Sequence, residues 1–525
     1  MKKALGRGRA CFWPLGFLFA LATALGLRLN RCGQSGWGAL ALCLGAALMV
    51  GPLLGEAFYW LARLLCRPRK PLSLSRQKAF WLSLAALLLC WLPVLLAFYP
   101  GITGYDIDNQ MAQILSGEYQ TNHPLLHTLL IGGCMKLLGY TAGYGLYTCI
   151  QTLLLALSVA YAMGCLAGMR TPRWLWIGLM CFFCLAPQHG VMAISGTKDV
   201  LFSAALLTLT VELLRLHREP KRLHKPLVWL WLLLVAVLVC HFRTVAVWGV
   251  GLLALVLLLA GRRRGGWRLP VCLLLSALLA LGMNAGLKAV LNVKKQSVAI
   301  TSEQLSIPCQ QLARVYMLSD ADELEKEEIL SRMPFVDESV PWLADKAKQA
   351  VYFGSKPQRL ISFLKLWGRE GLRYPIEYID AFLLTNKGYW DVGDDSFTTV
   401  YDHQSNDAKG VLMLRHVQGT PIEERSLLPG LKALWKRLFA ENQYKRIPLL
   451  GLLLHPAVFT WLTAFLFAFT LWKRQGKLAL LCGAILMETL LKLLGPCCLI
   501  RYQYDLMLIA PVLLGAVPVL AKEEP

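Results

Sequence analysis

The amino-acid sequence predicts an all-α protein that spans a membrane about 12 times. Of its 525 residues, 56% are hydrophobic and only 16% are charged, whereas about a quarter of the residues in soluble proteins are charged. Apolar stretches of about 18–25 residues recur along the chain, and a helix needs roughly 20 residues to cross the hydrocarbon core. The alternation of apolar and polar residues that a membrane β-barrel requires is absent.

Twelve apolar ranges have the length of a membrane-spanning helix. In this prediction residues 1–66 form an N-terminal hairpin, 79–291 form a core with an outer loop at 99–143, and 447–520 form the last spans. The predicted spans are 12–29, 37–62, 79–98, 144–167, 173–187, 198–216, 226–243, 245–261, 268–291, 447–472, 477–495 and 501–520.

Basic clusters between these ranges predict the orientation. They lie at 67–78, at Arg170 and Arg173, at 215–225, at 262–268 and at 473–477. If the further apolar stretch 124–140 crossed the membrane, the clusters after it would face outward. If it lies on the outer surface as an interfacial or re-entrant helix, every cluster faces the cytoplasm, as the positive-inside rule requires. We therefore expect a plasma (cytoplasmic) membrane protein with both termini inside.

The segment 292–446 differs from the rest of the chain. It holds 21 acidic and 21 basic residues, so the net charge of +22 comes from the other residues. The segment is long enough for a small domain, and "DELEKEEILSRM" has helical spacing of its apolar residues. We expect a mostly helical extracytoplasmic domain. The basic excess caps membrane spans and forms no groove with stacking aromatics, so nucleic-acid binding is not indicated.

Two carboxylates, Asp106 and Asp108, follow the third span in "GYDIDNQ". A carboxylate at this position can act as a general base or bind a divalent cation. The alternative is that either residue caps the short helix that begins here. His123 lies farther along the same outer loop, where it contacts either the interface or a substrate.

Three cations are expected at the same depth on the outer side. Lys198 lies beside Asp199 in "SGTKDVLF", and Arg243 and Arg501 lie at the ends of apolar runs. Cations near the mouth of an apolar bundle are costly unless they are used. Arginine offers paired hydrogen bonds and lysine a point charge, so a phosphate is the natural partner. A lipid phosphate would lie at this depth.

This arrangement resembles the glycosyltransferase C superfamily, in particular its protein-mannosyltransferase-like and aminoarabinose-transferase-like enzymes. The similar features are an outer-loop acid in "GYDIDNQ" followed by "NHPLLHTLL", then "SGTKDVLF", and a terminal "RYQYDLMLIAPVLL". The resemblance covers residues 79–291 and 447–520. Mannosyltransferases commonly carry adjacent Asp-Glu acids, whereas this chain has Asp106 and Asp108 separated by one residue.

The resemblance implies transfer of a sugar from a polyprenyl-phosphate donor to a saccharide, lipid or protein acceptor outside the cytoplasm. It implies Asp106 as the catalytic base in an inverting displacement. Metal use varies in the superfamily, which leaves open a divalent cation (Mg²⁺ or Mn²⁺) held by Asp106 and Asp199. The residues expected at the substrate are Tyr105, Asp108, Asn109, His123 and Asp199, and those expected at the donor phosphate are Lys198, Arg243 and Arg501.

Two other classes of function remain open. A transporter or flippase of lipid-linked saccharides would need the same cations, although transporters usually hold their substrate near the bilayer midplane between repeats. A scaffold that recruits a partner through 292–446 is the second alternative.

Overall fold

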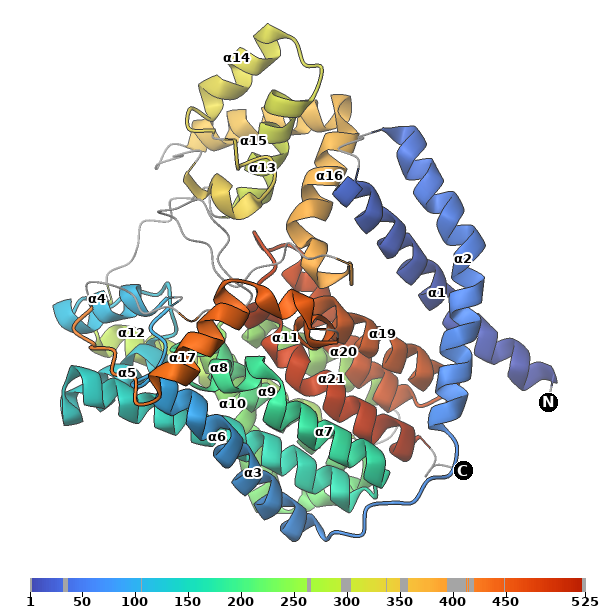
Figure 1. Cartoon of the computed structure of the whole chain (residues 1–525), viewed down its shortest axis with the longest axis vertical. Helices are drawn as coiled ribbons and strands as arrows, with labels where there is room; N and C mark the ends of the chain where they lie inside the picture. The colour runs from blue at the N-terminus through green and yellow to red at the C-terminus, as the bar shows by residue number, and fades with distance from the viewer. Residues whose placement is uncertain are drawn as a thin grey trace.

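In the structure, a computed structural model, the regular elements of the described part of the chain are all helices (Figure 1). No β-strand occurs in that part, and two isolated bridges pair Pro71 with Pro172 and Ile102 with Ser195. The predicted helical fold class is confirmed. The described residues are 2–31, 36–104, 106–261, 266–293, 304–336, 338–349, 357–393, 412, 414, 420–447 and 449–521.

Seven helices in the described ranges are long and apolar enough to cross a membrane, which makes this a multi-pass membrane protein. A helix pair bent by 52° at residue 186, α7 (Arg173–Leu185) and α8 (Pro187–Ala193), raises the number to 8 if it is counted as one broken span. The seven are α1 (Lys2–Arg31), α2 (Trp37–Leu65), α3 (Arg76–Ala97), α6 (Tyr140–Gly168), α9 (Lys198–Arg218), α12 (Arg268–Val290) and α21 (Ile500–Leu520).

Shorter helices of 16 or 17 residues occupy the other expected spans. The count of twelve spans therefore stays a prediction, although a helix lies in each of the twelve ranges. These helices are α10 (Pro226–Phe242), α11 (Ala246–Gly261), α19 (Pro456–Trp472), which follows the short α18 (Leu450–Leu454), and α20 (Gly476–Lys492).

The bundle is centred on α9 and α21. Both helices are largely buried, and α21 packs against α6, α7, α9, α19 and α20. A helix that is apolar on all sides belongs in the interior, and the run from Leu506 to Leu513 is buried at every position. The N-terminal hairpin of α1 and α2 joins this core through α19, where the rings of Phe12 and Phe465 lie 5.7 Å apart.

Two short helices precede α6 in the outer loop, α4 (Ile107–Ser116) and α5 (Leu125–Leu138). They pack on each other, and α5 packs on α6. Ile107 and Met111 of α4 share a small core with Ile131 and Met135 of α5. The 124–140 stretch is thus one helix attached to the bundle, and its interfacial position stays a prediction.

The 292–446 segment has two parts. Four helices, α13 to α16, form a unit with its own core at the top of Figure 1, and Arg28 of α1 bonds Asp380 of α16 at 2.6 Å. Residues 420–446 pack instead on the bundle: the backbone N–H of Leu427 donates to Leu96. The helices of the segment are α13 (Ser306–Leu318), α14 (Glu323–Arg332), η2 (Ala344–Gln349), α15 (Pro357–Arg373), α16 (Pro375–Asn386), η3 (Lys387–Tyr389), α17 (Pro429–Trp435), η4 (Lys436–Ala440) and η5 (Gln443–Arg446).

Basic residues gather at one end of the spans. The N–H of Arg173 donates to Lys70, which joins two of the basic clusters. Lys198 begins α9, and Arg215 and Arg218 lie in its last turn. Because a helix rises 1.5 Å per residue, the two ends of α9 lie about 30 Å apart, close to the thickness of a hydrocarbon core. Asp106, which binds Lys198, therefore lies at the end of α9 opposite Arg215 and Arg218.

Candidate functional site

A backbone strap brings the outer loop to the turn before α9. The N–H of Ile102 donates to Ile194 at 2.9 Å, and the N–H of Gly196 donates back to Ile102 at 3.0 Å. Glycine is required on both sides: Gly101 has a φ of +134°, and a Cβ on Gly196 would lie 2.1 Å from the Tyr144 hydroxyl oxygen. The strap therefore fixes residues 102–104 beside residues 194–199.

A ladder of buried polar side chains fixes α4 and α5 to the same turn. Gln110 bonds the Nδ1 of His127 at 2.9 Å, and the Nε2 of His127 bonds the Tyr147 hydroxyl at 2.6 Å. That hydroxyl donates to Gln151, whose amide donates to the carbonyl of Ser195 at 2.7 Å. Buried polar groups that are satisfied in this way rigidify their surroundings, so the ladder positions the loop that carries Asp106.

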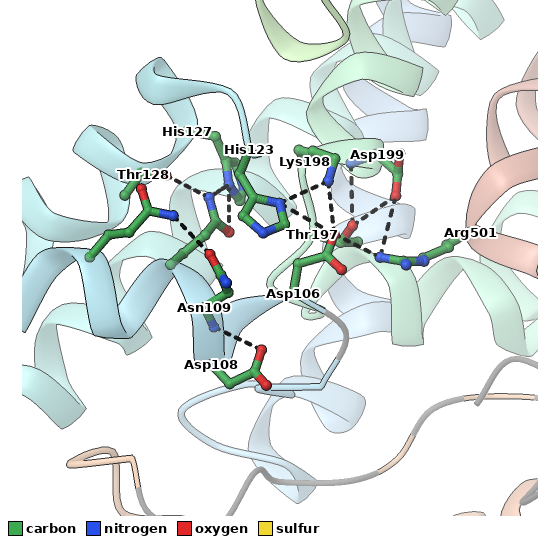
Figure 2. A network of polar contacts seen from close by, with 12 residues as sticks. Asp106, Asp108, Asn109, His123, His127, Thr128, Thr197, Lys198, Asp199 and Arg501 are labelled. Carbon is green, nitrogen blue, oxygen red and sulfur yellow. Dashed lines mark hydrogen bonds and ion pairs between the residues drawn. The ribbon is translucent and has the colours of Figure 1, made fainter. Parts of the chain in front are cut away.

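Five ionisable residues converge at this point (Figure 2), and we call them the Asp106 cluster. Oδ2 of Asp106 accepts from Nζ of Lys198 at 2.8 Å and from Nη1 of Arg501 at 3.0 Å. Nδ1 of His123 lies 3.1 Å from the Lys198 ammonium and 3.7 Å from Oδ2 of Asp106. The carboxylate of Asp199 lies 4.0 Å from Nη1 of Arg501. Residues 92 and 395 positions away from Asp106 thus share one of its oxygens.

Three helix N-termini meet at the cluster. Asp106 is the N-cap residue of α4, Lys198 is the first residue of α9, and Arg501 is the second residue of α21. The N-terminus of a helix carries partial positive charge and free N–H groups, so it favours anions. The side chain of Asp106 makes no capping hydrogen bond. Its carboxylate instead binds the two cations, in a position where an anion is favoured.

Electrostatics keep Asp106 ionised. Burial alone would raise the pKa of this carboxyl group, but the charges of Arg501 and Lys198 outweigh it and hold the pKa well below its usual range. Burial and the neighbouring Lys198 ammonium lower the pKa of His123. His123 is therefore neutral near pH 7, and its Nδ1 accepts from Lys198.

Two other residues expected at the substrate, Asp108 and Asn109, lie apart from this cluster. Asp108 and Asn109 are exposed, and Figure 2 shows the Asp108 carboxylate directed away from Lys198 and Arg501. Asp108 accepts from the N–H of Asn109 at 2.8 Å, a local contact in the first turn of α4. Tyr105 lies outside the described residues.

Arg243, expected at the donor phosphate, ends α10 and pairs with another acid. Its Nη1 lies 3.5 Å from Oε1 of Glu488, and its guanidinium lies over the ring of Phe202 at 5.1 Å. Lys198 and Arg501 therefore converge on Asp106, whereas Arg243 pairs with Glu488.

A second group of charges follows from Arg243 into the bundle, and we call Arg243, Glu488, Lys492 and Asp505 the Lys492 cluster. Nζ of Lys492 lies 2.7 Å from Glu488 and 2.7 and 2.9 Å from the two oxygens of Asp505. The sequence interpretation gave no role to Glu488 or Lys492. Their spacing of four in the apolar run of α20 was the available signal, since such a pair shares a helix face.

Charges alternate within each cluster. Each cation lies next to one or two acids, and each acid next to one or two cations. The order is Lys198, Asp106, Arg501 and Asp199 in the Asp106 cluster, and Arg243, Glu488, Lys492 and Asp505 in the Lys492 cluster.

The fit of a divalent cation to Asp106 and Asp199 was tested on their geometry. No group of three or more His, Cys, Asp or Glu side chains suited to a metal ion is found among the described residues. The guanidinium of Arg501 contacts both carboxylates, so a cationic side chain lies where a shared metal ion would bind. The arrangement of Asp106, Asp199 and Arg501 does not fit a metal ion.

Comparison of the sequence with known proteins and protein families identifies one family to which the chain belongs. No curated protein and no solved structure matches the chain. Residues 116–517 match the model of DUF6020, described as a family of unknown function. The matched range begins after Asp106 and includes His123, Lys198, Arg243 and Arg501. Because the match covers about three quarters of the chain, this protein is a member of the DUF6020 family.

Proposed function

We propose that this protein is a membrane glycosyltransferase. It moves a sugar from a polyprenyl-phosphate donor in the bilayer to a saccharide, lipid or protein acceptor on the extracytoplasmic side. The observation that carries the proposal is the convergence of Lys198 and Arg501 on Asp106 at three helix N-termini. Two fixed cations and a carboxylate at one end of a membrane bundle supply the groups that such a transfer needs.

The location of the cluster supports a lipid-linked substrate. The Asp106 cluster lies at the N-termini of α9 and α21. The basic residues in the last turn of α9 lie about 30 Å from it. By the positive-inside rule, the cluster then faces away from the cytoplasm of a plasma-membrane protein with both termini inside. Arg28 at the same end of α1 contacts Asp380, which favours an extracytoplasmic position for the α13–α16 unit.

Each group of the cluster has a role in a single displacement. The acceptor hydroxyl oxygen bonds to the anomeric carbon as the bond from that carbon to the phosphate oxygen breaks. The hydroxyl proton passes to Asp106. The electron pair leaves with the polyprenyl phosphate, whose charge Lys198 and Arg501 stabilise. The displacement inverts the anomeric configuration.

A transporter or flippase of lipid-linked saccharides is the second candidate. It is favoured by the Lys492 cluster, because ionisable residues inside a membrane bundle commonly line an ion or substrate pathway. A transporter moves its substrate between leaflets without breaking the bond from sugar to phosphate. Release of free polyprenyl phosphate therefore distinguishes the two functions.

The test uses the full-length protein in detergent with a panel of radiolabelled polyprenyl-phosphate hexoses and pentoses. Envelope extract from cells that lack the protein supplies the acceptors. We expect free polyprenyl phosphate and a labelled product with one donor. Asp106→Asn lowers the rate by about 10²–10⁴-fold, the usual range for loss of a general base.

The matched control is Asp320→Asn, the same change at an exposed position between α13 and α14. It keeps the wild-type rate, and size-exclusion profiles show that all variants are folded. Full activity of Asp106→Asn would exclude Asp106 as the base, and movement of intact donor between leaflets without release would favour the transporter.

A further inference from the structure

The two cations of the Asp106 cluster bind the same atom. Lys198 and Arg501 both donate to Oδ2 of Asp106, at 2.8 and 3.0 Å. Charge-assisted bonds of this length are strong. In this structure the carboxylate therefore occupies the position that two cations prepare for an anion.

While Asp106 is bound to both cations, the cations are less able to bind a phosphate and Asp106 is less able to accept a proton. The two cations are neutralised in part by Asp106, which weakens their attraction for a phosphate. Asp106 is a weak base while two positive charges hold its proton affinity low. The carboxylate and a phosphate also repel each other if both lie against the same cations.

We propose that the donor phosphate displaces Asp106 from Lys198 and Arg501, so that binding of the donor releases the base. The inference rests on the proposed glycosyl transfer and adds the regulation of its site. In the resting protein Asp106 acts as a substitute anion. In the complex the phosphate binds the two cations, and the released carboxylate accepts the acceptor proton.

The neighbours of the two cations allow this exchange. Lys198 keeps His123 as a second acceptor, at 3.1 Å. Arg501 keeps Asp199, at 4.0 Å, and the hydroxyl of Thr197 fixes Asp199 by donating to its Oδ2 at 2.9 Å. Both cations therefore stay in place when Asp106 leaves.

The surroundings of Asp106 allow movement as well. Its side chain is 23% exposed, and it lies at the start of α4 rather than inside a span. Release removes the two positive neighbours that lower its pKa, so the carboxylate becomes a stronger base.

Binding of a prenyl phosphate without a sugar tests the exchange separately from catalysis. The probe is radiolabelled farnesyl phosphate in equilibrium dialysis with the full-length protein in detergent. Asp106→Asn binds it about 10–100-fold more tightly than wild type, the gain expected when a competent state rises from 1–10% of the population to all of it. Arg501→Gln and Lys198→Met bind it more weakly than wild type, and Asp320→Asn binds it as wild type does.

Farnesol, which lacks the phosphate, is the second probe. The exchange predicts that Asp106→Asn does not change its binding, and equal tightening for both probes would overturn the inference. If the wild-type protein binds farnesyl phosphate and Asp106→Asn binds it equally or more weakly, the exchange is overturned. The proposed function would still stand in that case. Absence of farnesyl phosphate binding in every variant would contradict both.

Discussion

The Asp106–Lys198 pair of the first cluster and the Lys492–Asp505 pair of the second use the same residue types in different surroundings. The side chains of Asp106 and Lys198 are each 23% exposed, whereas those of Lys492 and Asp505 are each 4% exposed. Asp106 gives one oxygen to two cations, and Lys492 contacts both oxygens of Asp505. The first cluster lies where loops and helix N-termini meet, and the inner pair of the second joins α20 to α21.

The comparison teaches that burial and geometry assign the role of a charge in a membrane bundle. A carboxylate that is part-exposed and shared between two cations can be exchanged for another anion. A buried pair with two contacts holds helices together, because removing one partner leaves an uncompensated charge. The predictions that follow test this contrast, beginning with the largest effect.

Lys492→Met is expected to destabilise the protein by about 3–5 kcal/mol, because the buried carboxylate of Asp505 loses its partner. Thermal unfolding in detergent measures the loss. Adding Asp505→Asn to Lys492→Met restores part of it, since the double variant buries one charge fewer. If Lys198→Met lowers the melting temperature as much as Lys492→Met does, the contrast between the two clusters is wrong.

Lys198→Met is expected to lower the rate of sugar transfer by about 10²–10³-fold, the usual cost of removing one group that stabilises developing charge. Initial rates with the labelled donor measure the loss. Lys365→Met, at an exposed position of α15, is the matched control. An unchanged rate with Lys198→Met would show that this ammonium does not act on the leaving group.

Arg501→Lys keeps the positive charge but loses the planar guanidinium group. In that group Nη1 donates to Asp106 and Nη2 donates to the Tyr502 hydroxyl oxygen. Since lysine does not reproduce paired hydrogen bonds, kcat/KM falls by about tenfold. Steady-state kinetics on the labelled donor measure the effect. A wild-type value would mean that only the charge of Arg501 matters.

His123→Gln is expected to have the smallest effect. The effect is a change in how the stability of the folded protein depends on pH. Burial and Lys198 lower the pKa of His123 in the folded protein, so the unfolded chain binds a proton more readily. The stability linked to this histidine is present above about pH 6.5 and is lost as the pH falls. Glutamine can accept from Lys198 without titrating.

Melting temperatures between about pH 7.5 and 5.5 test this sign. The decrease on acidification is smaller in His123→Gln than in wild type, and the exposed His224→Gln keeps the wild-type decrease. A larger decrease in His123→Gln would contradict the neutral, accepting state assigned to His123.

Much of the fold follows from composition. The length of apolar runs predicts helices at 79–98 and 501–520, where α3 and α21 lie, since only a helix satisfies its backbone inside a membrane. The segment 292–446 was predicted as one unit, yet residues 420–446 pack on the bundle. Their placement depends on backbone bonds to Leu96 and Tyr99, which no local pattern encodes.

The site was predictable in its residue types and only partly in its pairings. Lys198 and Arg501 could be expected near Asp106 because they begin spans at one end of the bundle. The pairing of Arg243 with Glu488 depends on the rotation of α20 about its axis, which tertiary packing decides. Asp106 could be a helix cap in the sequence alone, and only the strap at Ile102 turns its carboxylate to two cations.

The release of polyprenyl phosphate from a labelled polyprenyl-phosphate sugar tests the central claim most directly. The account predicts steady release by the wild-type protein, together with a product of inverted anomeric configuration, and almost none by Asp106→Asn at equal protein concentration. Equal release by both proteins, or transport of the intact donor by both without release, would contradict it.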